Sequence, residues 1–203
     1  MSVTTAEVAE IIREVSTRVI DPGFRRLSPD QIHEKAPGDL VTDLDRQAEG
    51  ELSRLLTSAG GGIVVGEESV HDDASVLQEL PTAELAWVID PIDGTKNYVN
   101  GSTHHAVMIA EVQHGVTTRS WIWQPQLGHM WIAERGNGLV CDGEPVTSNQ
   151  RHPASETIEP DVPDSAQLLS LPDSARQVTA NRNVVRAVTV SYTHLTLPTS
   201  DLV

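Results

Sequence analysis

Two carboxylates stand three residues apart in the segment Trp87–Gly101 (WVIDPIDGTKNYVNG). The apolar run Leu85–Ile89 has the length and content of a buried strand. Asp90 and Asp93 follow this run, and Pro91 fixes the backbone between them. Two carboxylates at the end of a strand can both face one hard cation. The spacing therefore predicts a cation site at this end of the strand.

The residues after these carboxylates add a second ligand type. Gly94 and Thr95 open a predicted helix, and the free backbone N–H groups at a helix N-terminus favour an anion, above all phosphate. Metal plus phosphate is thus the first hypothesis. The simpler alternative is that Asp90 caps a turn and Asp93 caps the helix.

A second acidic pair follows the preceding predicted strand. The triglycine at 60–62 leads into the short apolar run Ile63–Val65, which continues directly into Gly66–Ser69 (GEES). Glu67 and Glu68 therefore stand at a strand end, as Asp90 does. Two successive strands that both end in carboxylates are more informative than either one alone.

A third acidic group precedes both strands. Thr42 is the predicted N-cap of a helix from Asp43 to about Ser58. Asp43 and Asp45 suit the positive end of that helix, which is a structural explanation for them. The segment 24–38 before it is polar and predicted to be irregular, and it carries Lys35.

The remaining elements change from helices to strands along the chain. A first helix capped by Thr4 or Thr5 extends to a break at Asp21–Gly23. Beyond Gly101 we expect three consecutive strands and a further hairpin. Their predicted ranges are His105–Val112, Val116–Trp123, His129–Ala133 and, for the hairpin, Leu139–Val146.

Composition excludes several classes of protein. The 203 residues contain 14 Lys and Arg against 29 Asp and Glu, a net charge of −15. This charge argues against nucleic acid or an anionic membrane as the main partner. The single cysteine, Cys141, rules out an internal disulfide and suits a reducing cytoplasm. No run approaches the ~18 apolar residues of a membrane span, so we expect a cytoplasmic protein.

These motifs together resemble the inositol monophosphatase family. Asp90–Tyr98 (DPIDGTKNY) is similar to the family signature. Lys35 ahead of Asp39–Asp45, then Gly66–Ser69, then Glu134–Gly138 match further family elements in the family's order. The resemblance covers roughly residues 4–148.

The resemblance implies a set of Mg²⁺ ligands. Glu67, Asp90 and the backbone carbonyl of Ile92 would hold one Mg²⁺. Asp90 and Asp93 would hold a second, and Glu67 would assist a third. Carboxylate, carbonyl and water oxygens are the ligands that Mg²⁺ prefers.

It also implies the residues that handle substrate and water. Backbone N–H groups of Gly94 and Thr95 would bind the substrate phosphate, and Lys35 would serve as a counter-charge near the phosphate or the acidic cluster. Asp45 and the Thr95 hydroxyl would position or deprotonate the attacking water. Together with Glu67, they form the implied catalytic set.

The fold implied by the resemblance is an α/β (α+β) sugar-phosphatase-like arrangement of αβαβα layers. Residues 1–150 would form the N-terminal lobe with the metal site, and 151–203 an incomplete or divergent start of a second αβ lobe. That lobe normally carries a Trp-Asp element whose aspartate ligates the second metal, and none of the four tryptophans here is followed by Asp. We hypothesise that the chain is truncated and that 191–203 are foreign sequence.

The implied function is Mg²⁺-dependent hydrolysis of a phosphomonoester by direct attack of metal-activated water, with inositol 1-phosphate as the first substrate candidate. Histidinol phosphate, fructose 1,6-bisphosphate and a 3′-phosphoadenosine nucleotide are alternative substrates within the same superfamily. A non-catalytic, truncated metal-binding protein is the alternative from another class. A small-molecule phosphate ester is the expected partner. The family resemblance also implies a homodimer.

Overall fold

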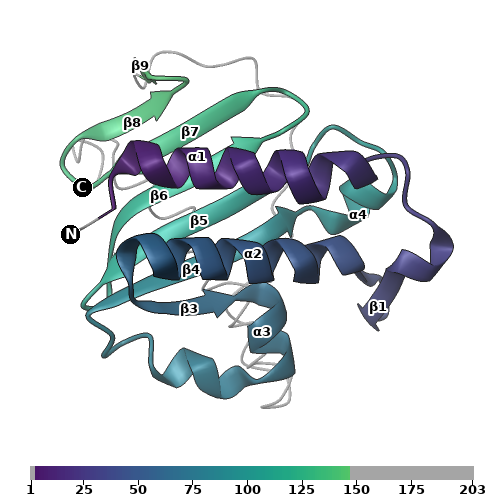
Figure 1. Cartoon of the computed structure of the whole chain (residues 1–203), viewed down its shortest axis with the longest axis horizontal. Helices are drawn as coiled ribbons and strands as arrows, with labels where there is room; N and C mark the ends of the chain where they lie inside the picture. Colours follow the sequence, from purple (N-terminus) through teal and green to yellow (C-terminus); the bar gives the residue numbers. More distant parts are fainter. Residues whose placement is uncertain (1–2, 147–203) are drawn as a thin grey trace, which may run out of the picture.

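The computed structural model describes residues 3–146 and shows two long helices lying across a large sheet (Figure 1). The helices are α1 (Thr5–Val15), α2 (Asp43–Gly60), α3 (Glu67–Asp72) and α4 (Thr95–Val99). A π-helical turn, Ser16–Ile20, and three 3₁₀ turns, Asp21–Gly23, Pro29–Gln31 and Ala74–Gln78, connect them. The strands are β1 (Ile32–Ala36), β2 (Asp39–Thr42), β3 (Ile63–Gly66), β4 (Leu85–Asp93), β5 (Ala106–Gln113), β6 (Val116–Gln124), β7 (His129–Glu134), β8 (Gly138–Cys141) and β9 (Glu144–Pro145).

Both long helices begin at side-chain caps that their sequences encode. Thr4 and Glu7 form a reciprocal capping box at the start of α1. Thr42 and Asp45 form the equivalent pair at the start of α2. The predicted caps and helices are confirmed.

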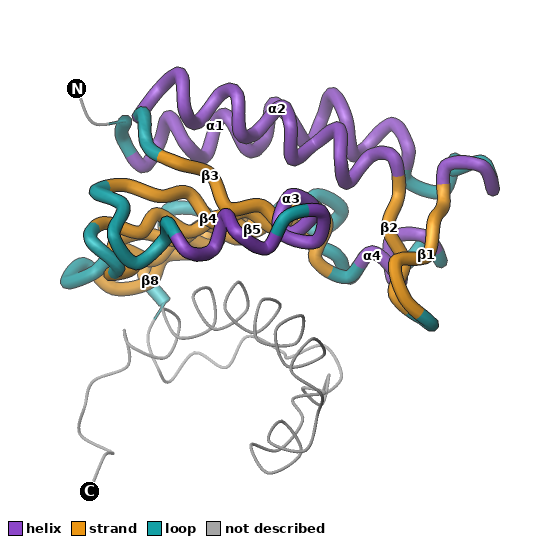
Figure 2. The backbone as a smooth tube through the Cα atoms, turned by 90° about the horizontal axis from the view of Figure 1, so that it is seen from below, coloured by secondary structure: helices purple, strands orange, loops and turns teal. Residues whose placement is uncertain are grey.

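The main sheet has the strand order β3-β4-β5-β6-β7-β8-β9. The pair β3 and β4 is parallel, and every later neighbouring pair is antiparallel. Figure 2 shows α1 and α2 together over one face of this sheet. The predicted mixed α/β fold is confirmed over the described residues.

The core occupies both faces of β4. Trp87 and Ile89 face the layer of α1 and α2, where they join the apolar residues of both helices. Ala86 and Val88 belong to a second cluster on the opposite face, with Val70 of α3. Since successive side chains of a strand point to opposite faces, a strand covered on both faces needs a continuous apolar run. This explains why residues 85–89, before Asp90, are all apolar instead of alternating between apolar and polar.

A β-bulge interrupts β4 between its two aspartates. Asp90 pairs with Met108 of β5, whereas Asp93 pairs with Ala106, so β4 uses one residue more than its partner. In a regular strand, residues three apart point to opposite faces. The additional residue in β4 therefore places Asp90 and Asp93 on the same face of the sheet.

The structure corrects the prediction for 24–38. That segment ends in β1, which pairs with β2 as an antiparallel hairpin, rather than being irregular throughout. The strand was missed because its sequence, IHEKA, is polar and mostly exposed. Predictions for 151–203, including the second lobe and the foreign end, lie outside the described residues. None of the helices within 3–146 combines the length and apolar character needed to traverse a bilayer.

Candidate active site

The parallel pairing of β3 and β4 brings the two acidic strand ends to one edge of the sheet. Gly66, the last residue of β3, pairs with Ile89. The next residues, Glu67 and Asp90, therefore lie at the same level along the two strands, just beyond the last β3–β4 pair. The structure thus brings Glu67 together with Asp90 and, through the bulge, with Asp93.

Asp90 is the most confined of these carboxylates. Its residue is 7% exposed, and its Oδ1 is buried with no hydrogen-bond partner in the described part of the chain. Burial, and then the negative charges of Glu67 and Asp93, raise the pKa of Asp90 well above its ordinary value. A buried oxygen without a donor is costly unless a cation or a proton meets it.

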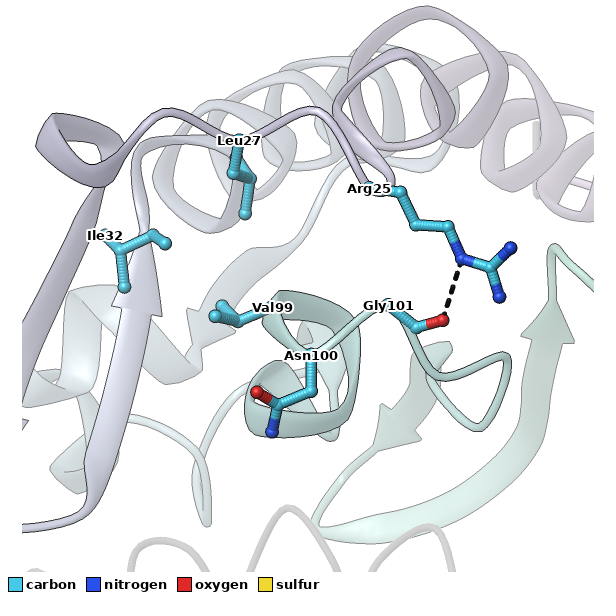
Figure 3. Close-up of a pocket in the computed structure, with 6 residues that line it drawn as sticks. All are labelled: Arg25, Leu27, Ile32, Val99, Asn100 and Gly101. Carbon is cyan, nitrogen blue, oxygen red and sulfur yellow. Dashed lines mark hydrogen bonds between the residues drawn. The ribbon is translucent and has the colours of Figure 1, made fainter.

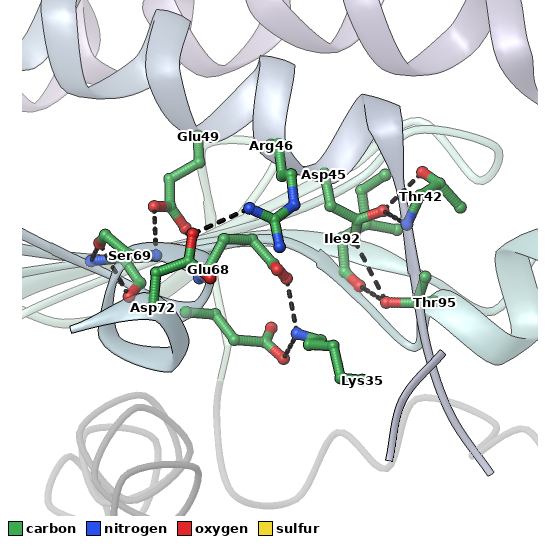
Figure 4. A network of polar contacts seen from close by, with 12 residues as sticks. Lys35, Thr42, Asp45, Arg46, Glu49, Glu68, Ser69, Asp72, Ile92 and Thr95 are labelled. Carbon is green, nitrogen blue, oxygen red and sulfur yellow. Dashed lines mark hydrogen bonds and ion pairs between the residues drawn. The ribbon is translucent and has the colours of Figure 1, made fainter. Parts of the chain in front are cut away.

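Asp45 connects the start of α2 to the start of α4 (Figure 4). Its Oδ2 accepts hydrogen bonds from the backbone N–H of Thr42 (2.8 Å) and from the Thr42 hydroxyl (2.6 Å). The Thr95 hydroxyl lies 3.2 Å from Asp45 Oδ1 and 3.0 Å from the carbonyl oxygen of Ile92, to either of which it can donate. Burial raises the pKa of Asp45 to about 7 despite the two Thr42 donors. Asp45 is therefore both a helix cap and a group that can exchange a proton near neutral pH.

Lys35 lies on the acidic side of this cluster. Its Nζ is 3.1 Å from Glu67 Oε1 and 2.7 Å from Glu68 Oε1, and its side chain is 5% exposed. Burial opposes the charged ammonium, but the charges of Glu67 and Glu68 outweigh it, and the pKa of Lys35 is raised. Lys35 therefore contacts the acidic cluster directly, and its contact with the substrate phosphate stays a prediction.

Glu49 is a functional candidate that the sequence reasoning missed. Its carboxylate accepts hydrogen bonds from the backbone N–H groups of Glu68 (2.7 Å) and Ser69 (2.9 Å), in the first turn of α3. These bonds fix the start of the helix that carries Glu67 (Figure 4). The available signal was a charged residue four positions after Asp45, on the buried face of α2.

Gly94 forms the turn between the aspartates and α4. It has a φ of 81° and is the N-cap residue of α4. A Cβ there would meet the carbonyl oxygen of His104 at 3.1 Å, so this turn requires glycine. The predicted phosphate contacts of Gly94 and Thr95 remain predictions.

A pocket of about 240 Å³ lies beside the far end of α4 (Figure 3). Its lining is Arg25, Leu27, Ile32, Val99, Asn100 and Gly101. Arg25 Nε donates to the carbonyl oxygen of Gly101 at 2.9 Å. None of these residues is among the predicted site residues, so the pocket is adjacent to the candidate site rather than part of it.

The oxygen groups at the end of β4 fit a hard divalent cation. Glu67, Asp90 and Asp93 offer carboxylates, and Ile92 offers a carbonyl oxygen next to the Thr95 hydroxyl. Within residues 3–146 the buried Oδ1 of Asp90 has no hydrogen-bond partner, and the charges of Glu67 and Asp93 oppose its ionisation. A bound cation would contact that oxygen and offset this repulsion. Mg²⁺ suits such a donor set, because it binds oxygen ligands and keeps several waters.

Comparisons with known proteins identify relatives that match half or more of this chain. Inositol-1-monophosphatase ImpA of Mycolicibacterium smegmatis is 32% identical over 145 residues, covering 71% of this chain and 49% of that protein. Nus factor SuhB of Vibrio cholerae is 34% identical over 108 residues, covering 53% of this chain and 39% of that protein. An IMPase structure from Thermotoga maritima matches with a TM-score of 0.58 and 26% identity, covering 69% of this chain and 52% of the other.

The chain spans about half the length of the curated relatives that it matches. The model of the inositol monophosphatase family, however, matches residues 2–197, most of the sequence. With the acidic strand ends of β3 and β4 in place, this match shows that the chain belongs to the inositol monophosphatase family.

Proposed function

We propose that this chain is a Mg²⁺-dependent phosphomonoester hydrolase whose site lies at the end of β4. Members of its family are phosphoric monoester hydrolases that use Mg²⁺. The observation that carries the proposal is the convergence of Glu67 and Asp93 on Asp90, whose buried Oδ1 lacks a donor among the described residues. Glu67, Asp90, Asp93 and the Ile92 carbonyl would hold the metal.

The chain's own residues supply the proton chemistry. Asp45 has a pKa of about 7, so its carboxylate can accept a proton from an attacking water near neutral pH. The Thr95 hydroxyl has one proton, and donating it to Asp45 leaves the Ile92 carbonyl oxygen available as a metal ligand. Bound Mg²⁺ would neutralise phosphoryl oxygens and lower the pKa of the water.

The remaining residues would orient the substrate and the acidic cluster. The backbone N–H groups of Gly94 and Thr95 would contact the phosphate. Lys35 would offset part of the charge of Glu67, which it contacts directly. A direct attack by water needs no covalent intermediate on the protein, so Cys141 has no role in it.

Inositol 1-phosphate is the proposed substrate, since the relatives include an enzyme named inositol-1-monophosphatase. Histidinol phosphate, fructose 1,6-bisphosphate and a 3′-phosphoadenosine nucleotide are the alternatives to assay beside it. The motifs belong to the metal and phosphate machinery, which does not select the alcohol. Cytoplasmic location and a homodimer stay predictions.

A second candidate follows from the relatives named Nus factor SuhB. Such a role could operate without phosphate hydrolysis and would agree with the alternative of a non-catalytic metal-binding protein. The net charge of −15 disfavours direct contact with nucleic acid, so this role would proceed through protein contacts. Absence of phosphate release from every substrate, despite Mg²⁺ binding, would favour it.

The deciding experiment measures phosphate release from the four substrates over a Mg²⁺ titration. We expect release that requires Mg²⁺ and falls by orders of magnitude in Asp93→Asn, because the variant loses a charged metal ligand but keeps the side-chain volume. Asp39→Asn, in the β1–β2 hairpin, is the control and should retain activity. Near-normal turnover of Asp93→Asn at limiting Mg²⁺ would refute the assignment.

A further inference from the structure

Three side chains of metal-binding type meet where β7 begins and β8 ends. They are His129, the first residue of β7, Cys141, the last residue of β8, and Asp142 in the turn that follows. Each can offer one ligand atom, and these atoms all lie within 4.8 Å of one another. The cluster shares no residue with the candidate active site.

The backbone pairing of the two strands fixes the position of the Asp142 carboxylate. Asp142 N–H donates to the carbonyl oxygen of Met130 at 2.9 Å, and Met130 N–H donates to Asp142 Oδ1 at 2.8 Å. With Oδ1 held by Met130, Oδ2 faces the other two side chains. His129 Nδ1 lies 2.8 Å from Oδ2, and Cys141 Sγ lies 3.7 Å from it.

The protons in this cluster are replaceable by a metal ion. A carboxylate only accepts hydrogen bonds, so His129 and Cys141 both direct their protons at Asp142 Oδ2. A divalent cation among the nitrogen, sulfur and oxygen would displace both protons and bind all three atoms.

We propose that His129, Cys141 and Asp142 form a second metal site, which binds Zn²⁺. Thiolate, imidazole and carboxylate are all zinc ligands, and three protein ligands leave a fourth position for water. Mg²⁺ is a poor occupant, because it prefers oxygen ligands. The side chains of His129 and Asp142 are 42% and 44% exposed, so an ion can reach the site from solvent while Cys141 closes its buried side.

The proposed site joins the two ends of the β7–β8 hairpin. His129 and Cys141 stand on neighbouring antiparallel strands, with Trp131 opposite Cys141. A metal bound to both residues would link these strands directly, and binding to the folded state alone stabilises that state. Occupancy should therefore raise the melting temperature, independently of any phosphatase activity.

The test uses Co²⁺ as a spectroscopic probe for Zn²⁺, with the full chain and a reductant that contains no thiol. Coordination of Co²⁺ by a thiolate gives a sulfur-to-cobalt charge-transfer absorption that carboxylate sites cannot give. The chain has one cysteine, so any such absorption reports this site alone. We expect one equivalent of Co²⁺ to produce the band and Zn²⁺ to abolish it by displacement.

Variants separate the site from adventitious binding. Cys141→Ser should abolish the band, and His129→Gln should weaken Co²⁺ binding at least about 100-fold, since loss of an outer partner already costs roughly 10–100-fold. The matched control is His33→Gln. His33 forms a similar exposed pair with Asp43 (2.7 Å) but is not among the residues grouped around the cysteine. That variant should bind Co²⁺ as the unmodified chain does.

The outcomes decide the proposal without reference to the Mg²⁺ site. Asp90→Asn should keep the band, because it alters only the other cluster. As a second measurement, Zn²⁺ should slow alkylation of Cys141 in the unmodified chain and much less in His129→Gln. A chain that gives no thiolate band, or a band unchanged in His129→Gln, would overturn the proposal.

Discussion

Asp45 carries two structural tasks at the scale of a single residue. One carboxylate oxygen completes the cap of α2 with Thr42, and the other faces the Thr95 hydroxyl. An Asn side chain retains an acceptor for Thr42 but cannot accept a proton as a base. We predict that Asp45→Asn lowers kcat by about 10²–10⁴-fold, the usual contribution of general base catalysis.

Steady-state phosphate release at saturating Mg²⁺ measures this effect. The control is Asp43→Asn, which removes an exposed carboxylate from the same first turn of α2 and should leave kcat within about twofold. Equal losses in both variants would show that Asp45 acts only through the charge or stability of the helix terminus.

The buried Asp45 carboxyl also predicts a pH dependence of stability. Its pKa is raised on folding from 3.8 to about 7, so the folded state binds this proton more tightly than the unfolded chain does. The stability from that proton is complete below pH 3.8 and is lost as pH rises to about 7. The loss is on the order of 4 kcal/mol at most.

Urea unfolding in the presence of EDTA, from pH 4 to pH 8, tests this prediction. The free energy of unfolding should fall more steeply with pH in the unmodified chain than in Asp45→Asn, because the variant has no proton to lose at that position. Burial also raises the pKa values of Glu49 and Glu68, but these groups are present in both proteins. Parallel pH curves would contradict the assigned pKa.

At the scale of elements, α2 can approach the junction of β3 and α3 closely because Gly66 at that junction has no side chain. A Cβ at Gly66 would overlap the Glu49 carboxylate, which α3 needs for its first backbone N–H groups. We predict that Gly66→Ala destabilises the fold by about 1–3 kcal/mol, as overpacking does. Gly50, one residue after Glu49 on α2, has open space where a Cβ would lie.

Gly50→Ala is therefore the matched control, and it should stabilise the protein by about 0.5–1 kcal/mol through helix propensity. Chemical unfolding of both variants measures the two effects. Changes of the same sign would mean that the close approach between Gly66 and Glu49 does not constrain the fold.

Glu49 also predicts a change in metal affinity through the position of α3. A Gln side chain at 49 has one acceptor oxygen and a donor amide where Glu68 and Ser69 both present N–H groups. We predict that Glu49→Gln raises the Mg²⁺ concentration for half-maximal activity by roughly 10–100-fold, while kcat at saturating Mg²⁺ largely recovers.

A Mg²⁺ titration of phosphate release provides the measurement. Glu51→Gln, on the outer side of the same helix and paired with Arg54, should not change the Mg²⁺ requirement. If Glu49→Gln lowered kcat at all Mg²⁺ concentrations with an unchanged midpoint, Glu49 would not position the metal ligands.

The elements that the sequence predicted well are those with local signals. Helix α2 begins where Thr42 predicts and extends two residues beyond the expected Ser58. Strand β5 lies one residue from its predicted range. Apolar periodicity and caps are properties of neighbouring residues, so the chain alone displays them.

Features that depend on pairing between distant segments were not predictable in the same way. The bulge in β4 is defined by the register against β5, which no residue within β4 specifies. Glu49 gains its importance only where α3 packs on α2. His129 and Cys141 become neighbours through strand pairing, and the sequence separates them by eleven other residues. The site residues taken from the family motifs are a different case, because the resemblance implies them as a set, and their roles stay predictions.

At the scale of the whole molecule, two effects of added salt must be separated. The net charge of −15 destabilises the compact state through self-repulsion. Monovalent salt screens this repulsion, with a Debye length of about 10 Å at 0.1 M. Mg²⁺ screens as well, but it should also bind the carboxylates around Asp90, where burial leaves an oxygen without a partner among the described residues. Binding to the folded state adds stability that screening cannot supply.

We predict that MgCl₂ raises the melting temperature above that in NaCl of equal ionic strength. Free Mg²⁺ at 100 times its Kd contributes about 2.7 kcal/mol, or roughly 5–10 °C for a chain of this size. In Asp90→Asn the difference in melting temperature between the two salts should vanish. In EDTA this variant should melt at a higher temperature than the unmodified chain, because it lacks the uncompensated buried carboxyl. Asp43→Asn should keep the difference, since its side chain is exposed. Scanning calorimetry of the unmodified chain and both variants in the two salts measures these melting temperatures. A difference between the salts that persists in Asp90→Asn would place the stabilising Mg²⁺ elsewhere on the molecule.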